Sequence, residues 1–341
     1  MLMKAIVYTK YGSPDVLQLK DVEKPTPKDN EVLIKVHAAS VNAYDWHFLT
    51  ADIFLLRLMG GGLLKPKNSI PGADIAGRVE AAGRNVKQFR PGDEVFGDIG
   101  HGAFAEYACV PESRLALKPA HLSFEEAAAV PMAALTALQG LRDAGQIQAG
   151  QKVLINGASG GVGTFAVQIA KSFGAEVTAV CSRRNLDQAR SIGADRVIDY
   201  TREDFTQNGQ PYDLIFAANG YHSLSAYKRA LAPRGIYVMA GGSLAQNFEA
   251  MLMGPRMSET GGKKMGGVSA KMDQRDLGLI RELIETGKVK PVIDRHYPLS
   301  EAAEALRYLG AGHARGKVVI TVEHHGRGLT PRSENGTKPT S

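Results

Sequence analysis

A glycine-rich segment near the middle of the chain has the residue types and spacing of a phosphate-binding loop. The run Gly157-Ala158-Ser159-Gly160-Gly161-Val162-Gly163 follows an apolar strand predicted over Lys152–Asn156 and precedes an amphipathic helix predicted over Thr164–Phe173. Its glycines allow backbone N–H groups to approach a pyrophosphate closely, and the N-terminus of the helix adds a partial positive charge. The segment therefore predicts a dinucleotide site, with an ordinary tight turn as the alternative.

The end of the next predicted strand indicates which dinucleotide is preferred. An NAD enzyme places a carboxylate there to accept hydrogen bonds from the ribose 2′-OH, whereas this strand, Glu176–Ser182, runs into Arg183-Arg184-Asn185. Ser182 and either Arg183 or Arg184 can bind a 2′-phosphate by charge-assisted hydrogen bonds, which favours NADPH. The residues leave the choice between the two arginines open. A solvated helix start is the competing interpretation of this pair.

The loop requires a parallel sheet to position it, and the chain alternates strand and helix from about Glu125 onward. This rhythm predicts an α/β fold with a doubly wound, Rossmann-type parallel sheet, whose ligands lie at the carboxyl ends of the strands. Its strands are expected at Lys152–Asn156, Glu176–Ser182, Arg196–Tyr200, Asp213–Ala217 and Ile236–Ala240. Helices are expected at Arg275–Thr286 and Glu301–Leu309, and a closing strand at Lys317–Glu323.

The first part of the chain has a different pattern, with short β runs separated by Pro and Gly. Runs at Lys4–Tyr8, Glu31–Ala38, Ile75–Ala82 and Glu94–Phe96 predict a mostly antiparallel, barrel-like domain. With 341 residues, the chain suits two such domains. We place the first domain at residues 1–124, the nucleotide domain at 125–292, a return to the first domain at 293–323 and a disordered tail at 324–341.

The composition excludes several classes of protein. The chain is 44% hydrophobic and 22% charged, which is typical of a globular protein. Its net charge of +6 is scattered among acidic residues, so no nucleic-acid partner is expected. Neither an apolar run long enough to span a bilayer nor a secretory signal is recognised, which predicts a soluble, cytoplasmic protein without a membrane partner. Two cysteines provide neither a disulfide framework nor a thiolate metal cluster.

Two segments are expected to shape a substrate pocket. The stretch Ala51–Lys67 reads as a long loop or short helix beside a cleft, and Phe248–Lys264 is the other poorly patterned segment. Met251, Met253, Met257 and Met265 suit a tolerant apolar pocket, although ordinary core packing also explains them.

Several motifs, in a fixed order over residues 1–322, carry a resemblance to a known family. They are Ser40-Val41-Asn42, Pro71-Gly72-Ala73-Asp74-Ile75-Ala76-Gly77, Arg90-Pro91-Gly92-Asp93-Glu94-Val95, Gly102-Ala103-Phe104-Ala105-Glu106-Tyr107, Ala158 to Gly163, Gly193-Ala194-Asp195 with Ile198-Asp199-Tyr200, and Ala314-Arg315-Gly316-Lys317-Val318-Val319. The chain resembles the medium-chain dehydrogenase/reductase superfamily, specifically its zeta-crystallin-like quinone oxidoreductases and reticulon-4-interacting-protein-1-like reductases. This resemblance implies a GroES-like domain joined to the Rossmann domain.

Alcohol dehydrogenases of this superfamily use zinc, but this sequence departs from their ligand pattern. Where they supply a histidine in Gly-His-Glu, this chain reads Gly72-Ala73-Asp74, and no cysteine occurs around Ala43–Asp45. Catalytic zinc takes Cys, His and carboxylate ligands in a tetrahedral array. The sequence therefore predicts chemistry without a metal.

The resemblance implies that hydride passes from NADPH to a quinone or an α,β-unsaturated carbonyl in a cleft between the domains. Asn42 matches a family asparagine near the nicotinamide, and Thr136 matches a threonine in the segment joining the domains. The matches to nucleotide contacts are Ser159, Gly161, Val162, Ser182, Tyr200 and Asn219. In the family, later segments complete the nicotinamide and phosphate side of the site. The residues of this chain that resemble those segments are Gly241, Gly242, Val268, Ser269, His313, Ala314 and Arg315. The family also implies a homodimer.

Quinone reduction leaves a stabilised anion, so donors aimed at the substrate oxygen would lower the barrier. Asn42 and Tyr44 are the candidates. Asn42 alternatively caps a turn, Tyr44 alternatively packs against Trp46, and Asp45 is expected to be structural. Two other functions fit the same sequence: an NADPH-binding sensor or structural protein with little turnover, and a zinc-free aldehyde or ketone reductase.

Overall fold

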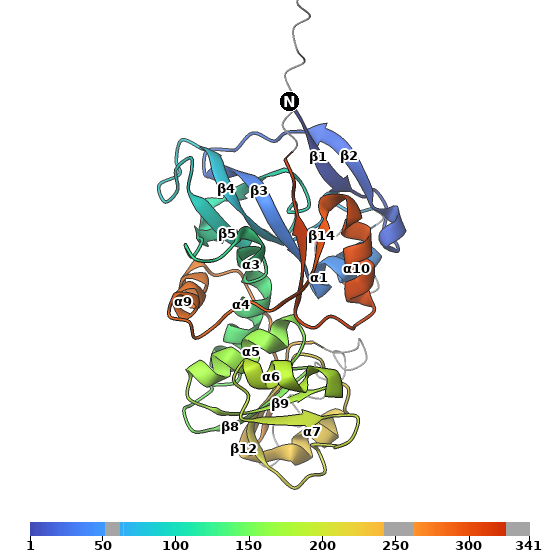
Figure 1. The fold of residues 1–341 in the computed structure, drawn as a ribbon, viewed down its shortest axis with the longest axis vertical. Coiled ribbons are helices and arrows are strands. Elements are labelled where there is room, and N and C mark those ends of the chain that lie inside the picture. The colour runs from blue at the N-terminus through green and yellow to red at the C-terminus, as the bar shows by residue number, and fades with distance from the viewer. Residues whose placement is uncertain (52–61, 64, 242–261, 325–341) are drawn as a thin grey trace, which may run out of the picture.

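We analysed a computed structural model of the chain, which describes residues 1–51, 62–63, 65–241 and 262–324. Figure 1 shows two stacked parts: the N-terminal strands together with the C-terminal elements lie at one end, and the helices and strands of the middle of the chain at the other. Each part is built on its own sheet, and helix α4 runs between them. The segments Ala51–Lys67 and Phe248–Lys264, with Met251, Met253 and Met257, and the tail from residue 325 lie largely or wholly outside the described residues.

The first part is a seven-stranded sheet of mostly antiparallel pairs. Its path is β14-β15-β3-β4-β5-β7, with β6 paired to β3 and a separate β1-β2 hairpin beside it. Of these pairs, only β14–β15 is parallel. The strands are β1 (Leu2–Val7), β2 (Gln18–Glu23), β3 (Glu31–Val41), β4 (Asp74–Ala82), β5 (Glu94–Asp98), β6 (Tyr107–Pro111), β7 (Leu115–Leu117), β14 (Ile293–Pro298) and β15 (Lys317–Thr321). Strand β15 pairs with β3, so the end of the described chain returns to the first sheet.

The second part is a six-stranded parallel sheet in the order β10-β9-β8-β11-β12-β13, and it confirms the predicted Rossmann-type class. The strand order reverses between β8 and β11, which is the switch point where ligands of such sheets bind. The strands are β8 (Lys152–Asn156), β9 (Glu176–Cys181), β10 (Arg196–Asp199), β11 (Tyr212–Ala217), β12 (Leu231–Met239) and β13 (Lys264–Gly267). Met265 on β13 is buried in the core of this sheet, so core packing is the correct interpretation for that methionine.

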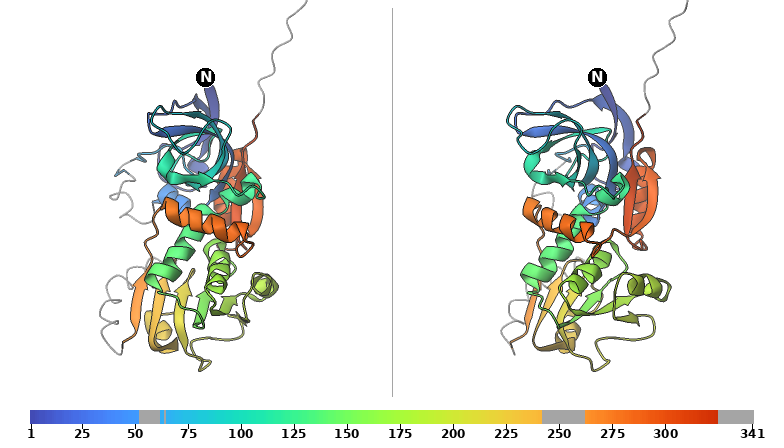
Figure 2. Two further views of the ribbon diagram at one scale, coloured as in Figure 1. Left: turned by 90° about the vertical axis from the view of Figure 1, so that its left-hand side faces the viewer. Right: turned by 60° about the vertical axis from the view of Figure 1, so that its left-hand side comes forward.

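Helices cover both sheets and connect them. They are α1 (Ala43–Thr50), α3 (Phe124–Ala128), α4 (Pro131–Gln139), α5 (Gly161–Ser172), α6 (Leu186–Ser191), α7 (Leu224–Ala230), α9 (Gln274–Glu285) and α10 (Ala302–Gly310). A π-helical turn, Gly140–Ala144, extends α4. Figure 2 shows α4 leading from one part to the other with α9 alongside it. None of the helices in the described ranges is long and apolar enough to cross a bilayer.

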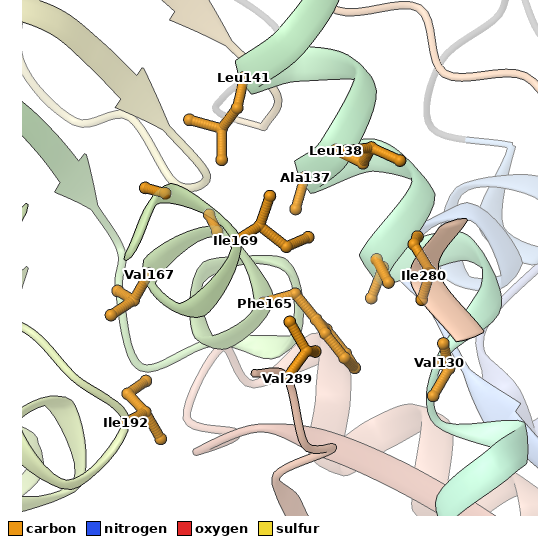
Figure 3. Packing of buried hydrophobic residues seen from close by; sticks show 14 of the residues in the cluster. Val130, Ala137, Leu138, Leu141, Phe165, Val167, Ile169, Ile192, Ile280 and Val289 are labelled. Carbon is orange, nitrogen blue, oxygen red and sulfur yellow. The ribbon is translucent and has the colours of Figure 1, made fainter. Parts of the chain in front are cut away.

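The core between these helices explains how the dinucleotide loop is held in place. Phe165, Val167 and Ile169 of α5 are fully buried and belong to one cluster with Leu138 of α4 and Ile280 of α9. Figure 3 shows Phe165 on the side of α5 that faces Val289 and Val130, and Val167 on the opposite side of the helix, near Ile192. Burying side chains of this size contributes about 1.5–3 kcal/mol each. The start of α5, and with it the glycine loop, is therefore fixed to the helix that connects the domains.

Candidate active site

The glycine loop forms the N-terminus of α5, which begins at Gly161, three residues before the predicted start. Gly160 is the N-cap residue in an extended conformation, and the N–H of Thr164 donates to its carbonyl. A Cβ on Gly163 would lie 2.0 Å from the carbonyl oxygen of Gly157, so only glycine fits there. The first turn of the helix therefore lies against its own loop, and its free N–H groups face the place where a phosphate would bind.

A cavity of about 310 Å³ lies beside this loop at the carboxyl ends of β8, β9 and β10. It gathers residues predicted from distant parts of the sequence. Those lining it are Ser159, Gly160, Ser182, Tyr200, Asn219, His313 and Ala314. The other predicted loop residues, Gly161, Val162 and Gly163, belong to the first turn of α5. The hydroxyl, amide and aromatic side chains of this lining could hold the adenosine half of a nicotinamide dinucleotide.

Arg184, and not Arg183, lines this cavity. Arg183 lies instead near Asp199, and its charge contributes to lowering the pKa of that carboxyl. Of the two arginines between which the sequence left the choice open, Arg184 is therefore the one placed at the cavity, although Arg183 was the one named among the site residues. Both arginines belong to one short 3₁₀ turn, in which successive side chains diverge, so adjacent positions cannot serve the same cavity equally.

Asn185 and Tyr221 are among the cavity residues that sequence reasoning missed. The Asn185 amide donates to the hydroxyl of Ser159 at 2.9 Å and to that of Ser182 at 3.2 Å, so it orients both serines. Tyr221 also lines the cavity, and its ring lies 5.5 Å from that of Tyr200. Asn185 directly follows the paired arginines, but nothing in the sequence indicates that its side chain is buried.

A second, larger cleft of about 830 Å³ lies between the two sheets. From the predicted residues it contains Tyr44, Thr136 and Val268; Gly241 lies nearby in the chain, next to Ala240, which also lines the cleft. Apolar side chains form much of the remaining wall: Met132, Leu135 and Met272. Asp98 and Arg114 also face the cleft and were not predicted. An apolar acceptor with one or two polar atoms suits this lining.

Besides Arg183, Gly241 and the three residues in the first turn of α5, three predicted residues line neither cavity. Asn42 lies behind the cleft and is buried, Ser269 is exposed, and the N–H of Arg315 donates to Asp294 at 2.9 Å. In the chain, Asn42 lies two residues before Tyr44, and Ser269 lies between Val268 and Ala270; Tyr44, Val268 and Ala270 line the cleft. For Arg315 the described contacts are structural, because they fix the turn that leads into β15.

Asn42 is part of a buried polar network that joins β3, β4 and β15. Its amide nitrogen donates to Asp74 at 3.0 Å, and its amide oxygen accepts a hydrogen bond from the ammonium of Lys317. Lys317 also lies 3.4 Å from Asp74, with 3% and 0% of the two side chains exposed. Asn42 is also the N-cap residue of α1, so the alternative that it caps a turn is confirmed. Sequence reasoning had placed Asp74 and Lys317 only in motifs.

The same network decides whether zinc fits where related enzymes hold it. The second oxygen of Asp74 accepts the N–H of Met132 at 3.0 Å, while the first receives Ser40, Asn42 and Lys317. An ammonium thus already neutralises the carboxylate, and the network contains no His or Cys. Over residues 1–51, 62–63, 65–241 and 262–324, no group of three or more His, Cys, Asp and Glu side chains could hold a metal ion. The residues present do not fit zinc.

Asp45 is the second buried carboxylate of this region, and its structural role is confirmed. It accepts the N–H of Asn42 at 2.8 Å and closes the first turn of α1. Burial, followed by the charges of Asp74 and Asp98, raises its pKa to about 7, against the hydrogen bond from Asn42 and the charge of Lys317. Near neutral pH, folding therefore forces a charge into a poorly solvated place.

Replacing this carboxylate should stabilise the protein in a pH-dependent way. A carboxyl whose pKa is raised on folding stabilises the fold below its unfolded pKa, and that contribution is lost as the pH rises through about 7. Asp45→Asn keeps an acceptor for the turn, so its free energy of unfolding should exceed the wild-type value by an amount that grows from pH 4 to pH 7, reaching at most about 3 kcal/mol. Urea unfolding of both proteins at four pH values measures this. A difference that stays constant with pH would show that Asp45 does not titrate in this range.

Tyr44 presents its hydroxyl toward the cleft side of α1. Its ring packs on Phe48, with 4.4 Å between centroids, and the hydroxyl lies 3.0 Å from Nε2 of His101. The alternative that it packs against Trp46 is wrong, because Trp46 instead lies against Gly310 of α10. Burial and the charges of Asp45 and Asp98 raise the pKa of Tyr44 to about 12, so the hydroxyl keeps its proton.

Both parts of the chain match known protein families. A model described as an alcohol dehydrogenase GroES-like domain matches residues 28–120, and one described as a zinc-binding dehydrogenase matches residues 192–320. The chain is similar to the 2-methylene-furan-3-one reductase of Solanum lycopersicum, with 38% identity over 93% of this chain and 79% of the relative. It is 35% identical to the chloroplastic NADPH-dependent alkenal/one oxidoreductase of Arabidopsis thaliana, over 93% of this chain and 79% of that protein.

A solved structure of a quinone oxidoreductase from Coxiella burnetii has the same fold. It superposes with a TM-score of 0.82 at 31% identity, covering 95% of this chain and all of that one. The shared architecture includes both domains, which confirms the expected combination of a GroES-like domain with a Rossmann-type sheet.

Proposed function

The chain belongs to the medium-chain dehydrogenase/reductase superfamily and is an oxidoreductase that uses a nicotinamide cofactor on a small molecule, and from this premise we propose that it transfers hydride from NADPH to quinones or α,β-unsaturated carbonyls without zinc. One observation carries the proposal. The cleft that contains Tyr44 and Thr136, with both apolar and charged side chains in its wall, opens between the sheets beside Val268, near the carboxyl end of the nucleotide sheet.

The bound cofactor supplies the hydride and its two electrons, and the residues of this chain provide binding and orientation. The cavity with Ser182 and Arg184 provides a hydroxyl and a guanidinium for a 2′-phosphate, and the end of β9 carries no carboxylate to repel it. Met132, Leu135 and Met272 provide apolar surface against which the carbon skeleton of an acceptor can pack. The hydroxyl of Tyr44 is one of the donors along this cleft, whose lining also includes Ser113, Arg114 and Lys271.

The proposal is tested by following nicotinamide absorbance with chelator-treated protein. NADPH and NADH are each offered with 1,4-benzoquinone, 9,10-phenanthrenequinone, a medium-chain enone and an aldehyde. We expect chelator-resistant turnover of the quinones or the enone, with NADPH preferred. If NADPH binds but no acceptor is reduced, the sensor function is favoured instead. If the aldehyde alone is turned over, the protein is a carbonyl reductase. Activity that returns only with zinc would contradict the proposal. The homodimer and the cytoplasmic location stay predictions of the sequence.

The preference for NADPH should depend on Arg184. A charge-assisted hydrogen bond contributes about 1.5–3 kcal/mol, so Arg184→Leu should lower the ratio of kcat/KM for NADPH over NADH by roughly 10- to 100-fold. Ser182→Asp should lower it further, because a carboxylate repels the 2′-phosphate and accepts from a ribose 2′-OH. Arg183→Leu is the matched comparison and should change the ratio less, since Arg183 does not line the cavity. A larger effect at Arg183 would reverse this assignment.

A further inference from the structure

Behind Tyr44 lies a histidine that connects the cleft to the surface. His101 is half-buried, lies in the bend between β5 and β6, and places Nε2 3.0 Å from the hydroxyl of Tyr44. Tyr44 lines the cleft, whereas His101 is absent from the lining and keeps part of its surface exposed. The two side chains therefore form a short chain of exchangeable protons that begins in the cleft and ends near solvent.

The bend that carries His101 is built to hold it in this place. Gly100 and Gly102 flank it with φ of +79° and +100°, values in the left-handed region that favours glycine. The N–H of Gly100 donates to the carboxylate of Asp98 at 2.9 Å, and Nε of Arg114 donates to the carbonyl of Asp98 at 2.8 Å. A turn fixed at both ends points the imidazole back toward α1.

Aromatic packing completes the arrangement. The ring of Phe48 lies 4.4 Å from that of Tyr44 and 5.1 Å from that of His101, measured between centroids, so it covers the pair on one side. Burial and the nearby charge of Arg114 lower the pKa of His101, and the imidazole is therefore neutral at pH 7. A neutral imidazole carries one N–H and one lone pair, so it can give a proton at one nitrogen and take one at the other.

We propose that Tyr44 and His101 form a proton relay, with Tyr44 as the catalytic acid and His101 as the positioning residue that reprotonates it. The inference rests on the proposed function and deepens it, because it identifies the substrate class that needs such a relay. Reduction of an α,β-unsaturated carbonyl leaves an enolate, a strong base that must gain a proton. The hydroquinone anion of an electron-poor quinone is a weak base and can leave without one.

The step balances in atoms and electrons. A C–H bond forms at the β-carbon from the hydride of the nicotinamide. The electrons of the C=C bond form a new double bond between the α-carbon and the carbonyl carbon, and the π electrons of the C=O bond move to the oxygen. The O–H bond of Tyr44 breaks as its proton passes to that oxygen, Nε2 of His101 returns a proton to the phenolate, and the other ring nitrogen takes one from water. The sum is the addition of a hydride and a solvent proton to the enone, and the enol then tautomerises to the ketone.

The relay is tested in single turnovers with two acceptors, an enone and an electron-poor quinone. For Tyr44→Phe we expect the rate of saturated-ketone formation to fall about 100-fold, the range of general acid catalysis, while quinone reduction and NADPH binding are retained. His101→Gln keeps an amide to hold Tyr44 but cannot pass a proton onward, so the enone rate should fall there too, and the solvent deuterium isotope effect should change. His121→Gln, an exposed histidine away from the cleft, is the control and should leave both rates unchanged.

The outcomes separate the relay from the function on which it rests. The relay would be overturned if Tyr44→Phe or His101→Gln retained the wild-type enone rate. It would also be overturned if a variant lost the enone rate and the quinone rate equally, because the pair would then only shape the cleft. A wild-type protein that reduces neither acceptor would overturn the proposed function itself.

Discussion

Replacing Lys317 with methionine should lower the free energy of unfolding by about 3–5 kcal/mol, the range observed when one partner of a buried ion pair is removed. Its ammonium is 3% exposed and lies beside Asp74, which is fully buried. Without it, Asp74 keeps a charge that burial makes unfavourable, and Asn42 loses the donor to its amide oxygen. Urea unfolding monitored by fluorescence and circular dichroism measures the change.

A double variant shows whether the loss comes from the unpaired carboxylate. Asp74→Asn combined with Lys317→Met removes both charges. The single amide oxygen of the asparagine still accepts the N–H of Met132, and its NH2 group can donate to the hydroxyl of Ser40, so more than half of the lost stability should return. Lys288→Met, at an exposed position, is the matched control and should change stability by less than about 0.5 kcal/mol. Equal unfolding midpoints for Lys317→Met and the wild type would show that the pair does not stabilise the fold.

The network also links cofactor binding to the first domain. The stem of Lys317 lies so close to the start of α5 that a Cβ on Gly161 would be 3.0 Å from its Cδ. Asp74 binds the N–H of Met132 in the first turn of α4, the helix that leads to the nucleotide domain. One buried ion pair therefore fixes Asn42, the start of α4 and the start of α5 relative to one another.

The fold and the adenosine side of the site were predictable because their signals are local. Strand β8, the glycine loop and α5 are adjacent in sequence, and Ser182 and Tyr200 each end or follow a strand of the same parallel sheet. Since parallel strands present their carboxyl ends at one edge, residues at those ends meet whatever the lengths of the helices between them. The cavity that gathers Ser159, Ser182 and Tyr200 follows this rule.

The polar network and the relay were not predictable, because their partners are far apart in the chain. Lys317 binds Asn42 across 275 positions, and Tyr44 meets His101 across 57. No periodicity or motif records that strand β15 returns beside β3, or that a bend after β5 points back toward α1. Neighbouring arginines could not be separated for a related reason: the direction of each side chain is set by the 3₁₀ turn and not by its type.

The largest effect on the nucleotide site is expected from Gly163→Ala. The added Cβ would lie 2.0 Å from the carbonyl oxygen of Gly157 and 2.8 Å from Cα of Ala158, both backbone atoms that cannot rotate away. The start of α5 must then move off its loop, so the free energy of unfolding should fall by about 3 kcal/mol, the upper range for overpacking. The N–H groups of the first turn move with it, and the affinity for NADPH should fall at least about tenfold.

Gly160→Ala is the matched control within the same loop, and it separates the two effects. A Cβ there would be 3.6 Å from its nearest neighbour, the carbonyl oxygen of Gly157, and the residue has φ −81° and ψ 176°, which alanine adopts readily. Its apo stability should therefore match the wild type. Because Gly160 lines the cavity, the methyl group should still weaken NADPH binding, as measured by fluorescence titration. Equal losses of stability in both variants would mean that any replacement of glycine destabilises the loop, whether or not its Cβ contacts Gly157. Unchanged NADPH affinity in both variants would mean that the pyrophosphate binds elsewhere.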